Sequence, residues 1–259
     1  MTEMTDAKQI LEWYLEAGVD ETCGEEPYKP EVKASIGIKA APAVPVLRQA
    51  TTDLAQETQS AVKSSREICE AAMDLESLKQ AVAAFDGCAL KLTATNTVFG
   101  HGSPTARVVF VGEAPGADED RAGVPFVGRS GRLLEKMLAA IALKREDCFI
   151  TNVLPWRPPG NRTPLESEIA VCLPFLRRQI DLIAPDFIFI LGGSAANALL
   201  ETGESISRLR GRWMDYKTAS GKNVQVLASF HPAYLLRNSG QKAKAWADFL
   251  RLKKELDNG

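Results

Sequence analysis

Three short segments carry residue types that could do chemistry on a planar, polar ligand. The first reads GEAPGADED from Gly112, and its glycines would let backbone N–H groups approach a ligand closely, next to the carboxylate of Glu113. It is not a phosphate-binding P-loop, because no Gly-Lys-Ser/Thr follows. In the second segment, Asn152 offers both a donor and an acceptor, which matches the edge of an amide-like heterocycle. In the third, SFHPAYLLRN, His231 would be delivered to the same rim by the end of a strand.

Each segment also has a purely structural interpretation. The glycine-rich loop could be an ordinary strand-to-helix turn that places Phe126 in the core, Asn152 could cap a turn, and His231 could be structural. The RPPGNR run at 157–162 could track phosphates with its two arginines, or it could be an exposed connection. The bulky residues at 235–237 could wedge into stacked bases, or they could form the first turn of a helix.

The elements around these segments predict an α/β fold. Short apolar strands are expected at 107–111, 148–153, 187–191 and 224–230, and helices at about 131–142, 165–183, 194–202 and 240–256. Nearly continuous apolar strands that alternate with helices indicate a parallel sheet covered on both faces. Ligands bind beyond the carboxyl ends of such strands, which is where the three segments lie.

Charge and composition divide the chain in two. The net charge is −2, but residues 1–74 hold 7 Lys/Arg against 14 Asp/Glu, so residues 75–259 carry +5. We interpret residues 1–74 as an acidic extension with a short amphipathic helix at 6–17 and a Pro/Ala-rich linker at about 24–55. An Ala-rich helical stretch is expected at 56–84. The remainder, 75–259, has enough apolar material for a core of its own.

Cysteine and histidine usage excludes several classes of protein. Five scattered cysteines suit reduced thiols in a cytoplasmic protein better than a disulfide framework. With two histidines and no CxxC pair, a zinc site would lack ligands at normal spacing. No apolar stretch approaches the ~18 residues of a membrane span, and the polar, acidic start is unlike a signal peptide, so no membrane association is expected.

Together the three segments resemble the motifs of the uracil-DNA glycosylase superfamily, most closely its bacterial and archaeal family 4. The similarity covers about residues 75–256, in the same order and at plausible spacing. It implies a three-layer α/β/α sandwich around a central four-stranded parallel sheet. It also implies a monomeric enzyme that flips uracil out of DNA and hydrolyses its N-glycosidic bond, with free uracil and an abasic site as products.

The resemblance assigns roles to the residues that would surround the flipped base. Phe126 would stack on it, Asn152 would read its polar edge, and His231 would donate toward O2, where negative charge grows as the base leaves. Gly112 and Ala114 would supply backbone contacts.

The carboxylates and the loop residues have implied roles as well. Glu113 would lie beside the reacting sugar, which gains oxocarbenium character, and is the candidate for activating water. Glu119 would lie near C5 of the base and exclude the methyl group of thymine. The expected DNA-contacting residues are Arg157, Arg162, Leu235, Leu236 and Arg237.

The chain departs from the family 4 pattern at the metal site. Such enzymes usually hold an iron–sulfur cluster with four cysteines, and here only Cys88 and Cys172 stand at the expected places. Phe85 and Trp156 occupy the other two, so we expect no metal and no cofactor. A chain that departs from the family at its metal site can also differ in substrate range, so the sequence leaves open whether uracil is the only base that it removes. Two alternatives to an active glycosylase also stay open: a catalytically weak module that binds damaged DNA, and an α/β protein that binds a small nucleotide.

Overall fold

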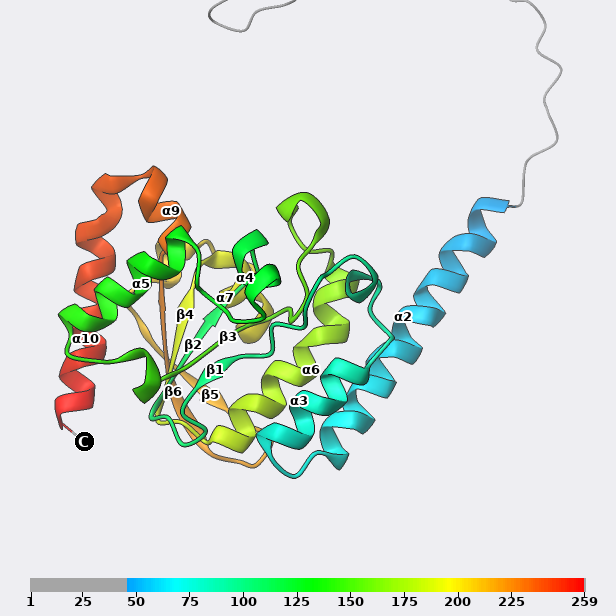
Figure 1. Ribbon diagram of the computed structural model, residues 1–259, viewed down its shortest axis with the longest axis horizontal. Coiled ribbons are helices and arrows are strands. Elements are labelled where there is room, and N and C mark those ends of the chain that lie inside the picture. The colour runs from blue at the N-terminus through cyan, green and yellow to red at the C-terminus, as the bar shows by residue number, and fades with distance from the viewer. Residues whose placement is uncertain (1–45, 259) are drawn as a thin grey trace, which may run out of the picture. The chain divides into compact units, whose positions relative to one another are not determined.

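The apolar runs form the strands of one central sheet in the computed structural model, which describes residues 46–258 (Figure 1). The strands are β1 (His101–Gly102), β2 (Val108–Gly112), β3 (Phe149–Asn152), β4 (Phe187–Leu191), β5 (Trp213–Lys217) and β6 (Asn223–Ser229). The α-helices are α2 (Val46–Ala71), α3 (Leu75–Ala84), α4 (Ala117–Ala122), α5 (Arg129–Ala140), α6 (Glu166–Ile183), α7 (Gly193–Leu200), α8 (Ile206–Leu209), α9 (Pro232–Arg237) and α10 (Lys242–Asn258). Short 3-10 turns are η1 (Ala89–Leu92), η2 (Arg145–Asp147), η3 (Pro159–Asn161) and η4 (Ser239–Gln241).

The sheet has the strand order β1-β3-β2-β4-β6-β5. The four predicted strands are its centre, where β3 pairs with β2, β2 with β4 and β4 with β6, all in parallel. Two further strands, β1 and β5, add to the edges in antiparallel orientation. The expectation of a four-stranded sheet therefore falls short by these two edge strands, while the α/β class is confirmed.

Alternate residues of the central strands point to opposite faces, as the two-residue period of a strand requires. On β2, Val109 and Val111 pack in one hydrophobic cluster, and Val108 and Phe110 pack in another. Both clusters consist of buried side chains, so both faces of the sheet are covered. This explains why the strands read as continuous apolar runs.

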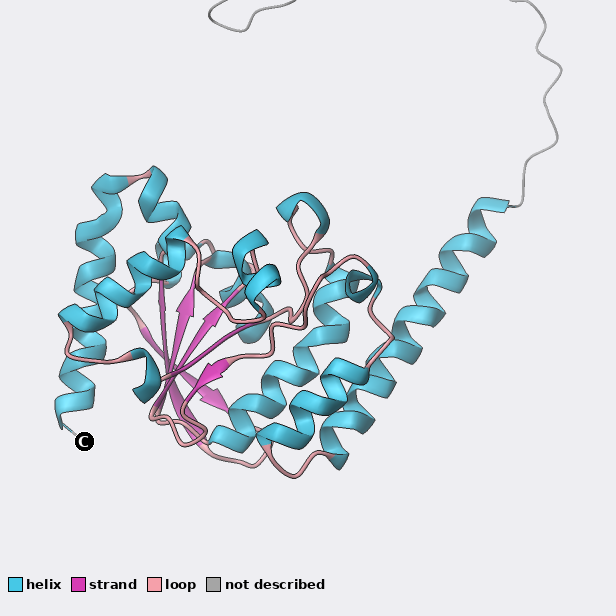
Figure 2. Cartoon of the chain, viewed as in Figure 1, coloured by secondary structure: helices cyan, strands magenta, loops and turns pink. Residues whose placement is uncertain are grey.

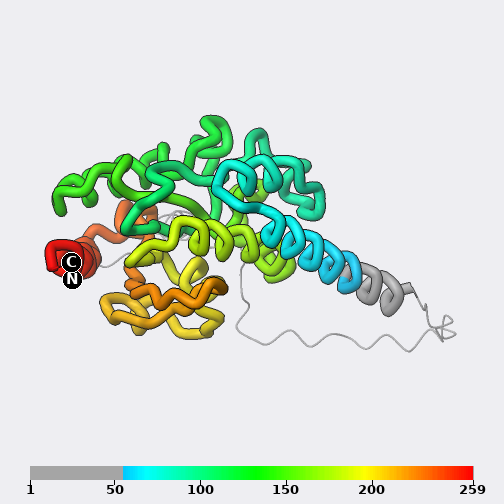
Figure 3. Tube along the Cα trace, turned by 90° about the horizontal axis from the view of Figure 1, so that it is seen from below, coloured from blue at the N-terminus to red at the C-terminus, as the bar shows by residue number. Residues whose placement is uncertain are grey.

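Helices form a layer on each face of the sheet (Figure 2). The first cluster gathers side chains of α2, α3, α6 and α7, and α2 lies beside α6 along one side of the molecule (Figure 3). The second gathers side chains of α5 and α10, including Leu134 and Phe249. The predicted helices at 131–142, 165–183, 194–202 and 240–256 correspond to α5, α6, α7 and α10. Within residues 46–258, no helix combines the length and apolar character that a bilayer crossing requires.

Helix α2 precedes the strands in the chain and belongs to the same compact unit as the sheet. The compact unit runs from Arg48 to Gly259, so it includes residues 48–74 of the expected extension 1–74. Helix α2 begins within the expected linker. The helical stretch expected at 56–84 consists of two helices, α2 and α3. The second begins after Asp74, whose side chain caps it by accepting a hydrogen bond from the Ser77 N–H at 2.7 Å. The helix expected at 6–17 lies outside the described residues.

Truncation tests this limit of the domain. Deletion of residues 1–47 should leave the thermal unfolding midpoint within about 2 °C, whereas deletion of residues 1–74 should lower it by roughly 3 °C or more. The longer deletion removes Cys69 and Ala72, which are 7% and 4% exposed and belong to the core. Equal midpoints for the two truncated proteins, measured by circular dichroism, would show that α2 contributes nothing to the core.

Candidate active site

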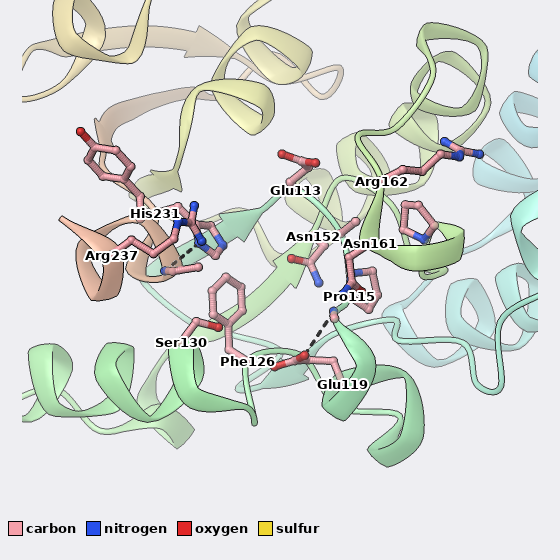
Figure 4. Close-up of a pocket in the computed structure, with 15 residues that line it drawn as sticks. Glu113, Pro115, Glu119, Phe126, Ser130, Asn152, Asn161, Arg162, His231 and Arg237 are labelled. Atoms are coloured by element: carbon pink, nitrogen blue, oxygen red, sulfur yellow. Dashed lines mark hydrogen bonds between the residues drawn. The ribbon is translucent and has the colours of Figure 1, made fainter. Parts of the chain in front are cut away.

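The three segments meet in one pocket beyond the carboxyl ends of β2, β3 and β6 (Figure 4). It encloses about 380 Å³, which is in the usual range of a small-molecule site. Among its lining residues are all three expected catalytic side chains, Glu113, Asn152 and His231. The other lining residues are Ala114, Pro115, Gly116, Glu119, Phe126, Ser130, Pro158, Asn161, Arg162, Ala233, Tyr234 and Arg237.

Gly112 and Asn152 are register partners at the ends of β2 and β3. Asn152 is only 5% exposed, and the missing side chain of Gly112 leaves room for it. A Cβ atom at residue 112 would lie 2.4 Å from Asn152 Oδ1 and 2.7 Å from the Phe126 ring. The expected role of Gly112 is therefore refined, because its lack of a side chain lets an amide and an aromatic ring come together.

Phe126 lies below Asn152 and beside His231 in the pocket (Figure 4). Its ring centroid is 5.5 Å from that of His231, with the two planes inclined by 32°. The residue is 4% exposed and has a left-handed backbone with φ 53°, which is rare for a bulky side chain. The ring lines the pocket, so a planar ligand can stack on it.

Glu119 joins the two loops that build this wall of the pocket. Its Oε1 accepts hydrogen bonds from the backbone N–H groups of Val127 and Gly128, both at 2.9 Å, and its Oε2 accepts from Gly116 at 3.1 Å. The side chain is 8% exposed and lines the pocket. The sequence predicts Glu119 at the pocket but not its role in joining the two loops, because no local pattern predicts hydrogen bonds to residues eight and nine positions away.

Glu113 enters the pocket from the opposite side to Glu119 (Figure 4). Its backbone is fixed, because its carbonyl accepts from the Leu154 N–H at 3.1 Å and the neighbouring Gly112 carbonyl accepts from the Val153 N–H at 2.9 Å. Ala114 follows along the same rim. The carboxylate is partly exposed and available to a ligand.

His231 is a neutral donor. Its Nδ1 accepts a hydrogen bond from the Ala233 N–H at 3.0 Å, so the proton of the neutral ring is on Nε2. Burial lowers the pKa of His231 from 6.5 to about 4, with a further lowering by the nearby Arg237 that Glu119 partly opposes. At neutral pH the residue therefore offers an uncharged N–H.

Comparison with known proteins decides the family. A family model described as the uracil DNA glycosylase superfamily matches residues 99–250. The chain belongs to this superfamily. A type-4 uracil-DNA glycosylase of Thermotoga maritima is 43% identical over 171 residues, which is 66% of this chain and 87% of that protein. The type-4 enzymes of Archaeoglobus fulgidus (44% identity; 64% of this chain, 84% of that protein) and Sulfurisphaera tokodaii (41%; 69% and 83%) are similar as well.

One of the residues that the superfamily resemblance marks for DNA contact, Leu235, needs correction. Leu235 is fully buried and packs with Phe230 and Ala245, because residues 232–237 form helix α9. It cannot contact DNA from that position, whereas the adjacent Leu236 is 40% exposed. Helical periodicity thus divides two neighbouring leucines between the core and the surface.

The three arginines expected at DNA differ in their ionic partners. Arg162 is held by Glu168, with its Nη1 2.9 Å and its Nη2 2.5 Å from the carboxylate oxygens. Arg157 donates through Nε to Asn161 Oδ1 at 2.7 Å. Arg237 is exposed at the end of α9 and has no ion pair among the described residues. Two of the three cations therefore lack a carboxylate partner within 46–258.

Several pocket residues were missed by sequence reasoning. Ser130, Asn161 and Tyr234 line the cavity, and Figure 4 shows the first two among the labelled side chains. Asn161 and Tyr234 lie within the quoted motifs RPPGNR and SFHPAYLLRN, so membership of a motif was the available signal for these two, whereas Ser130 lies outside the quoted motifs. The orientation of the Asn161 side chain depends on the local turn, in which the backbone of this residue is left-handed with φ 55°.

The four positions that the resemblance to family 4 assigns to a cluster all belong to one buried hydrophobic cluster of the core. Phe85 and Trp156 stack with centroids 6.3 Å apart, and Phe175 packs edge-on to Phe85 at 5.2 Å. The Sγ atoms of Cys88 and Cys172 are 3.9 Å apart. Among the described residues, no group of three or more His, Cys, Asp or Glu could hold a metal ion. Two thiols and two aromatic rings do not fit a four-cysteine cluster.

The pKa of His231 gives a test of this geometry. Between about pH 6.5 and 4 the unfolded chain binds a proton that the folded chain does not, so stability falls as pH falls through this window and is retained above it. Relative to a His231→Gln variant, the free energy of unfolding should decrease by up to about 3 kcal/mol across the window.

Chemical denaturation at several pH values measures this effect. His101→Gln, which removes the exposed histidine of β1, serves as the matched control and should keep the pH dependence of the unsubstituted protein. An unchanged slope in His231→Gln would mean that His231 does not stay neutral across this window.

Proposed function

We propose that the protein is a DNA-repair uracil glycosylase that hydrolyses the N-glycosidic bond of uracil in DNA, with free uracil and an abasic site as products. The observation that supports it is the convergence of an aromatic ring, an amide and a neutral imidazole N–H in one pocket: Phe126, Asn152 and His231. A flipped base needs a stacking surface, donors and acceptors for its edge, and stabilisation of its departing charge. The type-4 relatives, named as uracil-DNA glycosylases, support the same activity.

In this proposal the base stacks on Phe126, and Asn152 bonds to its polar edge. His231 donates from Nε2 to O2, where negative charge develops as the bond to the sugar breaks. A neutral donor suits this task, because it stays in place without transferring its proton at neutral pH. The pocket needs no charged acid for the step.

Glu113 would act on the sugar side of the bond. Its partly exposed carboxylate stabilises positive charge on the sugar and orients the attacking water. Glu119, fixed by its three backbone hydrogen bonds, would lie near C5 of the base and exclude the thymine methyl group. Leu236 and Arg237 would enter the gap in the duplex, and Arg157 would contact phosphate.

A uracil-containing oligonucleotide followed by alkali treatment tests the activity. The protein should cause strand scission at the uracil, and Asn152→Ala and His231→Ala should each reduce the single-turnover rate by roughly 10²–10³-fold, the usual loss for one such donor. Asn223→Ala and His101→Ala carry the same changes at exposed positions and should keep the full rate. Binding of the uracil-containing duplex without scission would instead support a damage-binding module.

We also propose that the protein holds no iron–sulfur cluster and acts as a monomer without a cofactor. Stacked rings fill two of the four ligand places. The two remaining thiols, with Sγ atoms 3.9 Å apart, supply only half of the ligands that a four-cysteine cluster requires. Trp156 is further fixed by its Nε1 donation to Thr97 at 3.1 Å.

Metal analysis of anaerobically purified protein tests the absence of the cluster. We expect only traces of iron and acid-labile sulfide. The double variant Phe85→Cys with Trp156→Cys restores four cysteines and is the matched positive control, prepared in the same way. Iron and sulfide at near-stoichiometric levels in the unsubstituted protein would contradict the proposal.

A further inference from the structure

The backbone of Phe126 adopts a conformation that is unfavourable for a residue with a bulky side chain. Its φ of 53° is a conformation that glycine adopts freely and a phenylalanine avoids. A glycine here would remove the ring that faces the pocket. The surrounding structure must therefore hold a bulky residue in an unfavourable conformation, as is common at functional sites.

Arg145, from η2, contacts the backbone on both sides of Phe126. Its Nη1 donates to the Phe126 carbonyl at 2.9 Å, and its Nη2 donates to the Pro125 carbonyl. These carbonyls belong to the two peptide planes that flank the Phe126 Cα, and φ and ψ describe how those planes are turned about it. A planar guanidinium with two parallel donors fixes both planes at once, which a lysine cannot do.

Two neighbouring features complete this arrangement. A Cβ atom at Gly131 would lie 1.9 Å from the Phe126 carbonyl oxygen, so only glycine leaves space for the carbonyl. On the other side of the same peptide, the Val127 N–H donates to Glu119. The peptide after Phe126 is thus held by Arg145 at its carbonyl and by Glu119 at its N–H.

We propose that Arg145 is a positioning residue that holds the Phe126 ring at the pocket by fixing its left-handed backbone. The guanidinium does not line the pocket itself, and its side chain is only 15% exposed. It acts on catalysis only through Phe126, so the inference rests on the proposed stacking of the base on that ring. Without the two bonds, the backbone relaxes toward negative φ and the ring leaves its place against Gly112 and Asn152.

Substitution at Arg145 should slow the reaction and leave binding to undamaged DNA unchanged. Arg145→Met keeps an unbranched side chain but removes the donors, and should lower the single-turnover rate by roughly 10–100-fold, since small misplacements of a site have effects of this size. Arg145→Lys should fall between this variant and the unsubstituted protein. Glu135→Gln removes the ion pair that Arg145 makes at 3.3 Å but leaves both carbonyl bonds, and should stay within about twofold of the full rate.

A double-mutant cycle separates positioning from general stability. In a Phe126→Ala background, Arg145→Met should cause no more than about twofold further loss, because the ring that it positions is gone. The same 10–100-fold loss in both backgrounds, or full activity of Arg145→Met, would overturn the proposal. Thermal unfolding of each variant shows that the protein tested is folded, and Arg145→Lys provides a milder change if Arg145→Met does not fold.

Phe126→Ala alone tests the stacking on which the inference rests. A full rate in that variant would refute the stacking role of the ring. A reduced rate in Phe126→Ala together with a full rate in Arg145→Met would refute the positioning role of Arg145 only. The two failures are therefore distinguishable.

Discussion

The pocket depends on the three hydrogen bonds that one buried carboxylate accepts from the backbone. Glu119 comes from the first turn of α4 and binds the N–H groups of Gly116, Val127 and Gly128. Burying a charge is costly unless such donors surround it, and here three amides do. The glycine-rich loop after β2 and the turn that carries Phe126 are thereby one unit. The place of Glu119 in the pocket is set by these bonds.

The central strands and long helices could be predicted because their apolar patterns are dictated by burial on both faces of the sheet. The edge strand β5 could not, since its residues are only half-buried and its sequence, WMDYK, shows no apolar run. Its pairing with β6 is a tertiary contact. Likewise the packing of α2 on the core could not be predicted, because α2 is polar and Ala-rich and gains its place through a few buried residues such as Cys69.

The candidate site also combines residues that the sequence predicts with residues that it does not. Asn152 and His231 were predictable because strand ends deliver them to one rim, and their motifs mark them. Arg145 was not, because it reaches Phe126 from 19 residues away and nothing in its local sequence signals that contact. The neighbouring leucines at 235 and 236 look alike in the sequence, and only the orientation of α9 decides which one is buried.

The ion pair between Arg162 and Glu168 has a consequence for how the protein would travel on DNA. A cation that neutralises a phosphate releases counterions from the DNA. On B-form duplex, each such contact adds about −0.9 to the slope of log affinity against log salt concentration. A guanidinium that already has a carboxylate partner displaces fewer ions. With Arg162 occupied in this way, the motif loops have Arg157 and Arg237 left for this purpose. In the DNA binding proposed above, Arg162 would therefore add less to the salt dependence of affinity than an arginine without a carboxylate partner.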